Sequence, residues 1–305
     1  MTRPTPHVCT TEAEWHAARW EGIGASEAAD LIEKPYSLWA EKVGLVERKQ
    51  PNNVDRLEEG HLAEPMIAEL VKRRCGVKRI RRSWEVLGLD SEPHDVVFSD
   101  AEHDWLRATP DYFIQAEDGS SAVCEMKFWD AFSRELWVNG PPLGVFLQVQ
   151  QQMEVLQVPR ALIAPYFGVG RFEPIWVDRE PKWTALLRQR GSDLWARVAA
   201  GRRALEAGED PHQFAPEAVS RLDLDALKRF KPREDTEVEI PQELAERFAA
   251  AHRARKEADD AYSDVQAELR KRMVEASATV ATHSDEKLAT LKTNARGTVT
   301  FRPAI

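Results

Sequence analysis

Residues 108–114 and 122–128 alternate between apolar and polar positions with the two-residue period of a β-strand. In the second run, Glu125 and Lys127 therefore project from one face, and the apolar side chains between them project from the other. We expect the apolar face to join the core and the polar face to carry chemistry.

A turn signal between the two runs predicts that they form a hairpin. Asp118-Gly119 lies in the polar stretch that separates them, and Asp-Gly is among the strongest short signals for a tight β-turn. The turn would fold the strand of Asp111 back beside the strand of Glu125 and Lys127. Two carboxylates and one amine are then expected to converge.

The remaining hydrophobic pattern predicts a sheet with helices around it. Alternating runs predict strands over residues 84–89, 96–98, 106–109, 160–166 and 171–177. Apolar positions three and four residues apart predict helices over residues 11–19, 27–32, 37–44, 60–71, 130–137, 145–156 and 183–206. The strands would build the sheet that carries the hairpin.

The composition changes after residue 206, where the predicted core domain, residues 1–206, ends. Residues 207–241 are rich in Pro, Asp and Glu, which predicts an acidic linker or a loosely packed arm. Residues 242–305 are predicted to form a long helix and then a short hairpin, whose parts are residues 287–293, a turn at 294–297, and residues 298–302.

The long C-terminal helix carries a narrow apolar seam. Its positions follow alternating steps of four and three residues, with Arg255 in one place of the repeat. Such a seam packs on its own domain, on a copy of itself or on another protein, and self-packing is the default expectation. The apolar members are Leu244, Phe248, Ala251, Ala258, Tyr262, Val265 and Leu269.

The chain has 305 residues, of which 43% are hydrophobic, enough to bury a substantial core. No apolar run approaches the roughly 20 residues of a membrane span, and residues 1–6 lack the apolar segment of a signal peptide. We therefore expect a soluble, cytoplasmic protein. Cys9, Cys75 and Cys124 are widely spaced, so no disulfide framework, zinc site or four-cysteine iron–sulfur cluster is indicated.

The net charge of −9 requires any basic surface for nucleic acid to be local, because phosphate binding normally needs clustered Lys and Arg. Residues 72–82 form the densest basic run. This run fits contact with a DNA backbone, and it equally fits a solvated helix end.

Asp111, Glu125 and Lys127 suit a metal-dependent, phosphodiester-cleaving site. Hard carboxylate oxygens with open positions favour Mg²⁺ or Mn²⁺, which can clamp a phosphate and lower the pKa of a bound water. An adjacent lysine can hold that water and offset developing charge. The alternative is that Glu-x-Lys is only the charged face of an edge strand, but Pro110-Asp111 one hairpin earlier favours the functional interpretation.

Glu64 and Gln148 are candidates for the other wall of this site. Glu64 precedes Pro65, near which the helix over residues 60–71 is expected to start or be interrupted, and a carboxylate there can point back at the metal. Gln148 can hydrogen-bond the attacking water or a phosphate. The plain alternatives are a first-turn glutamate favoured by the helix dipole and a polar helix face.

Arg19 and Ser26 are candidates for binding an anion. Residues 22–26 look like a glycine loop that runs into a helix, with Ser26 at or near its N-cap. The unpaired N–H groups and dipole of such a helix end attract anions, and Arg19 could add a bidentate contact to a terminal DNA phosphate. An ordinary capped helix is the alternative.

Taken together, these motifs occur in one order that resembles the lambda exonuclease family, also called the YqaJ-type viral recombinase family, a branch of the PD-(D/E)XK nucleases. The resemblance covers roughly the first two thirds of the chain and is specific through the joint order of its motifs. The motifs are Trp15-His-x-x-Arg19, Gly22-Ile-Gly-Ala-Ser26, Gly60-x-x-x-Glu64-Pro65, Pro110-Asp111, Glu125-Met-Lys127 and Gln148-Val-Gln150-x-x-Met153.

The resemblance implies an α/β (α+β) core of PD-(D/E)XK type, with a central mixed sheet flanked by helices. The helical C-terminal arm follows from the residue pattern alone and has no strong match to the lambda enzyme. The resemblance also implies a Mg²⁺-dependent 5′→3′ exonuclease on linear double-stranded DNA, which leaves 3′ single-stranded tails for an annealing protein. A ring-shaped homotrimer and a phage or prophage origin are also implied. On this resemblance Glu64, Asp111 and Glu125 bind metal, Lys127 and Gln148 complete the catalytic set, and Arg19 and Ser26 bind the 5′-phosphate.

Two other functions are compatible with the same residues. An endonuclease of the same fold would also cut closed circular DNA. A DNA-end-binding or scaffolding protein without catalysis would use the C-terminal arm to recruit a partner, although the complete set of Asp111, Glu125 and Lys127 argues against an inert site.

Overall fold

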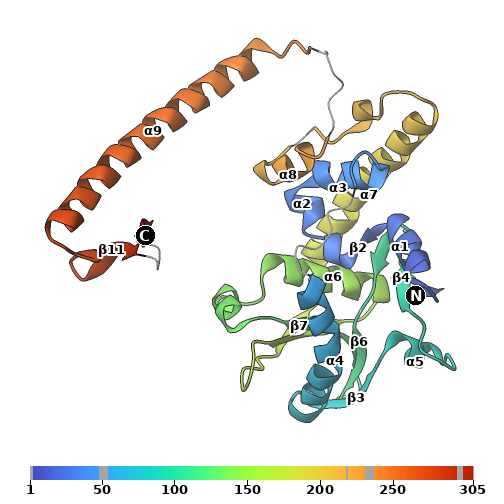
Figure 1. Cartoon of the computed structure of the whole chain (residues 1–305). Helices are drawn as coiled ribbons and strands as arrows, with labels where there is room; N and C mark the ends of the chain where they lie inside the picture. Colours follow the sequence, from blue (N-terminus) through green and yellow to red (C-terminus); the bar gives the residue numbers. More distant parts are fainter. Residues whose placement is uncertain (1–2, 48–53, 218, 231–236, 294–297, 305) are drawn as a thin grey trace. The chain divides into compact units, whose positions relative to one another are not determined.

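The computed structural model describes residues 3–47, 54–217, 219–230, 237–293 and 298–304 (Figure 1). The chain divides into two compact units, residues 1–231 and residues 232–305. Each unit has its own sheet, and each is described by itself.

A five-stranded mixed sheet runs through the first unit in the order β3-β6-β7-β8-β9. Strand β7 pairs antiparallel with β6 and parallel with β8, so it lies in the middle of the sheet. The bounds are β3 Val77–Arg81, β6 Tyr112–Ala116, β7 Ser121–Phe128, β8 Arg160–Tyr166 and β9 Ile175–Asp178. The predicted hairpins of β6 with β7 and of β8 with β9 are confirmed.

Two helices cover opposite faces of this sheet. On α4 (Val54–Arg74), Ile67 and Val71 pack with Cys124 of β7 in one apolar cluster. On α6 (Leu143–Leu156), Val149 and its neighbours pack with Val123 in another. The expectation that one face of β7 is core and the other is chemistry is therefore wrong: a central strand between two helices has two core faces, and the polar positions occupy only its C-terminal half.

A second sheet, of order β1-β4-β5-β2, lies in the N-terminal part of the unit. It combines β1 Thr5–Cys9, β2 Ile23–Gly24, β4 Asp95–Ser99 and β5 Leu106–Ala108, and β2 runs parallel to β5. The strand predicted over residues 84–89 is wrong, because Ser83–Leu87 form the short helix α5. The Glu85 carboxylate accepts the Arg82 N–H at 2.7 Å, and Gly88 ends the helix in a left-handed conformation.

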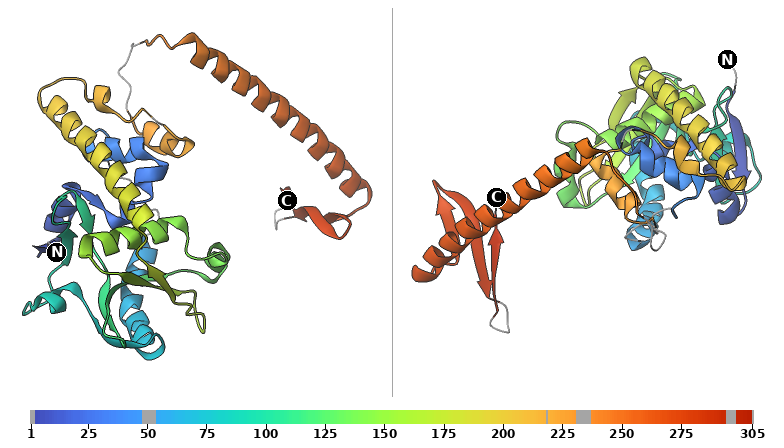
Figure 2. Two further views of the ribbon diagram at one scale, coloured as in Figure 1. Left: turned by 180° about the vertical axis from the view of Figure 1, so that it is seen from behind. Right: turned by 90° about the horizontal axis from the view of Figure 1, so that it is seen from above.

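A helical layer of α2 (Asp30–Glu33), α3 (Pro35–Val43) and α7 (Pro181–Glu206) encloses Trp39, which is fully buried. Figure 2 shows α3 and α7 side by side from two directions. The helix α1 Glu12–Trp20 packs on β1 and β4. A 3-10 helix, η2 Ala131–Trp137, follows β7 where a helix was predicted.

Residues 207–230 belong to the first compact unit, which differs from the predicted linker of residues 207–241. Asp223 is fully buried and accepts hydrogen bonds from the Ser37 N–H at 2.8 Å and the Ser37 hydroxyl at 2.7 Å. Asp223 also accepts the Ser220 N–H at 2.7 Å. Few apolar residues are needed here, because hydrogen bonds to a buried carboxylate hold the segment. Its elements are η3 Pro211–Phe214, η4 Arg221–Asp223 and α8 Leu224–Leu227.

The second unit contains one long helix and one small sheet. Helix α9 is Gln242–Glu275, and the sheet β10-β11-β12 follows it, with bounds Val280–His283, Glu286–Thr293 and Val299–Pro303. The predicted pairing of residues 287–293 with residues 298–302 is confirmed by the β11 and β12 register, although the first strand, β10, was not predicted. The predicted turn at residues 294–297 lies outside the described residues.

In the described part of the chain, every helix is too short or too polar to cross a bilayer.

We predict that Asp223→Ala destabilises the first unit by about 2–4 kcal/mol, because it leaves buried donors of Ser37 and Ser220 without an acceptor. Urea unfolding monitored by tryptophan fluorescence measures this change. The control is Glu217→Ala, an exposed carboxylate in the same segment. Equal stability of the two variants would mean that residues 207–230 do not stabilise the unit.

Candidate active site

The hairpin of β6 and β7 brings Asp111 beside Glu125, as predicted. Gly119 adopts a left-handed φ of 84° in the connecting turn, and Tyr112 pairs with Cys124, so Asp111 stands just before β6. Its Oδ2 accepts the backbone N–H of Met126 at 2.6 Å. This bond fixes the Asp111 carboxylate against β7.

Glu125 is the centre of a hydrogen-bond network. It is 3% exposed, and its Oε1 accepts from Lys127 Nζ at 2.6 Å and from Gln148 Nε2 at 2.7 Å. Its Oε2 accepts from Gln152 Nε2 at 2.7 Å. The Lys127 ammonium also donates to Gln148 Oε1 at 3.1 Å. Donors from both β7 and α6 thus stabilise a carboxylate that burial alone would strongly disfavour.

The charges around Lys127 favour its protonated form. Burial alone would lower the pKa of Lys127, but the carboxylates of Glu125 and Asp111 outweigh burial and raise that pKa. Lys127 is therefore an ammonium that can neutralise charge and donate hydrogen bonds.

Glu64 lies in the same electrostatic field as Asp111 and Glu125. Burial raises the pKa of Glu64, and Glu125 raises it further, while His61 and Arg82 lower it. Its Oε2 lies 3.7 Å from Arg82 Nη2. Glu64 is therefore close enough for its charge to interact with those of Asp111 and Glu125.

The helix that carries Glu64 is continuous, so the expected start or interruption near Pro65 is wrong. Helix α4 runs through Pro65, which has no N–H to donate to the carbonyl of His61 one turn earlier. Packing of the following turn on the sheet, through the fully buried Ile67 and Val71, outweighs this local cost.

The carboxylate cluster fits a hard divalent cation. Burial and the nearby carboxylates of Glu125 and Glu64 raise the pKa of Asp111 well above its ordinary value, so negative charge is concentrated there without full compensation. The Oε1 atom of Gln152 is also buried and has no hydrogen-bond partner in the described structure. Among the described residues, no group of three or more His, Cys, Asp or Glu side chains is arranged so that it could already hold a metal ion. The donor chemistry nevertheless matches Mg²⁺ or Mn²⁺.

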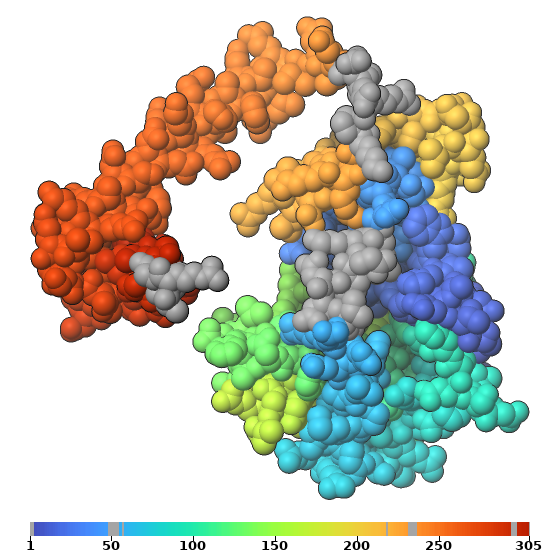
Figure 3. All heavy atoms as spheres, in the orientation of Figure 1, coloured from blue at the N-terminus to red at the C-terminus, as the bar shows by residue number. Residues whose placement is uncertain are grey.

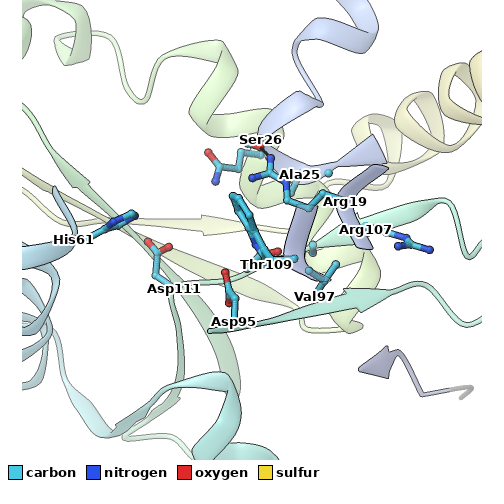
Figure 4. A pocket seen from close by; sticks show the side chains of 13 residues that line it. Arg19, Ala25, Ser26, His61, Asp95, Val97, Arg107, Thr109 and Asp111 are labelled. Atoms are coloured by element: carbon cyan, nitrogen blue, oxygen red, sulfur yellow. Dashed lines mark hydrogen bonds between the residues drawn. The ribbon is translucent and has the colours of Figure 1, made fainter. Parts of the chain in front are cut away.

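A cavity of about 180 Å³ joins this cluster to the predicted anion-binding pair. Arg19, Ser26, Asp111 and Gln148 all line it, whereas Glu64, Glu125 and Lys127 are not among its lining residues. Figure 4 shows Asp111 and His61 on one side of the cavity and Arg19 and Ser26 on the other. Two groups of residues that were predicted separately therefore share one space.

Arg19 is oriented by two contacts. Its Nη2 donates to Ser26 Oγ at 2.8 Å, and its guanidinium lies 4.7 Å from the ring centroid of Trp15. Asp95 lines the same cavity, and burial raises its pKa although Arg19 lowers it. A cation, a hydroxyl and an aromatic ring thus lie together at this end of the cavity, beside one acid.

A buried ion pair between Lys42 and Glu27 holds the loop before Ser26 in place. Lys42 Nζ lies 2.9 Å from Glu27 Oε2 and donates to the carbonyl of Arg19 at 3.0 Å, and Glu27 Oε2 accepts the Gly24 N–H at 2.8 Å. Ser26, predicted at or near an N-cap, lies near one but is not the cap itself. Gly24 precedes the 3-10 helix η1 Ala25–Glu27, because the Glu27 carboxylate captures its N–H.

Gly22 lies at the start of this loop, where any side chain would clash with Trp105 and Arg107. A Cβ there would lie 2.5 Å from the Trp105 carbonyl oxygen and 2.7 Å from Arg107 Cδ. The Arg107 side chain passes this point to donate to the Ala18 carbonyl at the end of α1. Only glycine lets β2 approach β5 this closely.

Gln152, Glu27 and Lys42 are residues that sequence reasoning missed. Gln150, Gln151 and Gln152 are all fully buried, in the helix that was predicted to be buried. A run of glutamines in an otherwise apolar helix was the available signal. No comparable signal marked the pairing of Glu27 with Lys42, which depends on the packing of α3.

Comparisons with known proteins identify a related domain and a similar fold. A family model for the YqaJ-like viral recombinase domain matches residues 14–158. The alkaline exonuclease LHK-Exo from Laribacter hongkongensis is similar in structure: identity is 18%, the match covers 64% of this chain and 97% of that chain, and the TM-score is 0.52. The structure of LHK-Exo in complex with dAMP gives the same values.

A phage-related exonuclease from Haemophilus somnus is a more distant structural match, with 11% identity, coverage of 62% of this chain and 96% of that chain, and a TM-score of 0.40. No curated protein matches the sequence. The likeness to LHK-Exo confirms the predicted fold class, a PD-(D/E)XK-type core with a mixed sheet flanked by helices.

We predict that Asp111→Asn stabilises the metal-free protein at neutral pH by roughly 1–3 kcal/mol, because it removes a poorly compensated buried charge. The asparagine can still accept the Met126 N–H. Thermal unfolding in EDTA measures the change, at roughly 2–4 °C per kcal/mol for a domain of this size. Added Mg²⁺ should raise the Tm of the wild type and not that of the variant.

The pH dependence of this difference has a defined sign. The pKa of Asp111 is raised in the folded state, so its contribution to stability is present at low pH and is lost as the pH rises through that pKa. The gap between Asp111→Asn and the wild type should therefore close as the pH falls towards about 4. Asp118→Asn, in the exposed turn, is the control, and a similar gain there would contradict the argument.

Proposed function

Residues 14–158 belong to the YqaJ-like viral recombinase family, and from this premise we propose that the chain is a phage-type exonuclease. It hydrolyses linear double-stranded DNA from the 5′ end with Mg²⁺, for which Mn²⁺ can substitute. The product is a 3′ single-stranded tail for recombination by strand annealing.

The observation that carries this proposal is the shared cavity. Arg19 and Ser26 line it together with Asp111 and Gln148, and Gln148 is bonded to Glu125 and Lys127. An anion-binding pair that shares a cavity with two members of a phosphodiester-cleaving site is what an end-recognising nuclease requires. A nuclease that cuts internally has no comparable need for a terminal-phosphate site.

Asp111, Glu125 and Glu64 would hold the metal. When bound, Mg²⁺ supplies a Lewis acid for the scissile phosphate and a lowered pKa for a water at the site. Glu125 would exchange some of its present donors for the cation, since Lys127, Gln148 and Gln152 now occupy both of its oxygens.

Lys127 and Gln148 would handle the attacking water and the developing charge. As an ammonium, Lys127 donates hydrogen bonds and offsets negative charge on the phosphate in the transition state. Gln148 can accept from a water through Oε1 and donate through Nε2, and its bond to Lys127 fixes the orientation of its amide.

Arg19 and Ser26 would hold the 5′-phosphate. Because Arg19 Nη2 donates to Ser26 Oγ, the Ser26 hydroxyl proton can point towards a phosphate oxygen. The Arg19 guanidinium can make a charge-assisted contact to the same phosphate. The ion pair of Glu27 with Lys42 holds the loop that carries Ser26, and so it fixes Arg19 and Ser26 relative to each other.

The remaining DNA contacts would come from the basic run. Lys72, Arg73 and Arg74 end α4, and the exposed Lys78 and Arg79 lie on the edge strand β3. Figure 3 shows the outer side of α4 at the surface of the first unit.

A ring-shaped homotrimer, an annealing protein as partner and a cytoplasmic location remain predictions from the resemblance.

We expect digestion of linear 5′-phosphorylated duplex DNA with Mg²⁺ and none of covalently closed circular duplex. Lys127→Met should lower the rate by about 10²–10³-fold, the range for removing one transition-state donor. Gel analysis of end-labelled substrates measures both rate and direction. Cutting of the circle would favour the endonuclease, and full activity of Lys127→Met would overturn the site.

Arg19→Gln should remove the preference for a phosphorylated end. We expect the ratio of rates on 5′-phosphate and 5′-hydroxyl ends to fall about 10- to 100-fold, because a charge-assisted contact of roughly 1.5–3 kcal/mol is lost. Arg190→Gln, an exposed arginine on α7, should keep the wild-type ratio. If Arg19→Gln slows both substrates equally, Arg19 serves the fold and not the DNA end.

A further inference from the structure

Helix α9 exposes its apolar seam over most of its length. Leu244 is 49% exposed, Phe248 70%, Tyr262 53% and Val265 66%. In water, a helix of this length gains most of its stability from packing such a face. The seam therefore lacks the contact that its sequence is built to make.

The second unit covers only the C-terminal end of this seam. Met273 is 3% exposed where α9 meets the strands β10–β12, and Leu269 is partly buried. Figures 2 and 3 show the terminal sheet at that end of α9 and the rest of the helix free of it. Within the described part of this unit, residues 244–265 have no packing partner for the seam.

We propose that α9 pairs with α9 of a second copy of this chain as an antiparallel two-stranded coiled coil, centred between Lys256 and Glu257. In this register each residue before the centre lies opposite the residue equally far beyond it. Three properties of the helix select this partner and this direction: charge, side-chain size and the residues that flank the seam.

The charges of α9 lie in two opposite blocks on either side of the centre. Residues 245–256 contain four Lys or Arg and one Glu, a net charge of +3. Residues 257–268 contain five Asp or Glu and no Lys or Arg, a net charge of −5. An antiparallel pair lays each basic block on the acidic block of the other copy, whereas a parallel pair lays like on like.

The sizes of the seam residues are complementary in the same register. Tyr262 lies opposite Ala251 of the partner, Arg255 opposite Ala258, and Phe248 opposite Val265. Large side chains thus meet small or medium ones, as knobs-into-holes packing requires. A parallel pair would instead stack Arg255 on its own copy.

The residues beside the seam add two oppositely charged pairs. Arg247 comes to lie near Glu268 of the partner, and His252 near Asp259. Glu268 Oε1 accepts a hydrogen bond from Arg272 Nη2 of its own helix at 3.1 Å. The other carboxylate oxygen, Oε2, can then bind a second cation. Asp259 Oδ2 lies 3.5 Å from Arg255 Nε on the same helix, and it would help to neutralise the charge of Arg255 inside the seam.

Light scattering of the full-length protein tests the pairing. Val265 and Val274 are matched, because they are 66% and 63% exposed and lie on opposite sides of the helix, nine residues apart. Val265→Glu should halve the molar mass of the wild type, because each copy then loses its α9 partner. Val274→Glu should leave that mass unchanged.

Disulfide formation tests the direction. The double variant A251C/Y262C should form an intermolecular disulfide in high yield on oxidation, because the two positions face each other in the antiparallel register. The single variants A251C and Y262C should not, since each cysteine then faces a tyrosine or an alanine. The wild type, with Cys9, Cys75 and Cys124, gives the background.

Either of two results overturns the proposal. An equal mass for the wild type and Val265→Glu means that the seam packs within one chain or on a different protein. Efficient cross-linking of the single variants means that the helices are parallel. Both readouts are independent of nuclease activity, so they do not depend on the proposed function.

Discussion

The candidate site depends on the burial of one carboxylate, that of Glu125. An ionised carboxylate in a core is tolerated only when hydrogen bonds replace its lost hydration. Here the donors are Lys127 on the same strand and Gln148 and Gln152 on α6. These bonds require α6 to pack on β7 in one register, so the chemistry and the packing of the sheet fix each other.

The hairpin and its roles could be predicted because their signals are local. Alternation along residues 122–128 places Glu125 and Lys127 on the same face of one strand, and the Asp118-Gly119 turn brings that strand beside Asp111. The order of six short motifs then supplied the resemblance, and residues 14–158 match the corresponding family. The roles of the site residues, Glu64 among them, remain proposals that their common field supports.

Three of the misjudged features depend on contacts between distant segments. Residues 207–230 look like a linker by composition, but Ser37 binds the buried Asp223 from a segment 186 residues earlier. Pro65 predicted a helix boundary, but burial of Ile67 on the sheet outweighs its missing N–H. The Glu27–Lys42 pair required knowledge of how α3 packs. In each case a long-range interaction overrules a local preference.

The two units use charge in opposite ways. In the first, buried charged groups need dedicated partners, as Glu27 has in Lys42 and Asp223 has in Ser37. In α9 the charges stay in water, where one pair contributes little and only an ordered series can discriminate between partners. Exposed blocks of opposite sign therefore favour a selective, reversible contact.

The net charge of −9 fits the same division, because binding of DNA in the first unit then depends on local clusters of Lys and Arg and not on the overall charge.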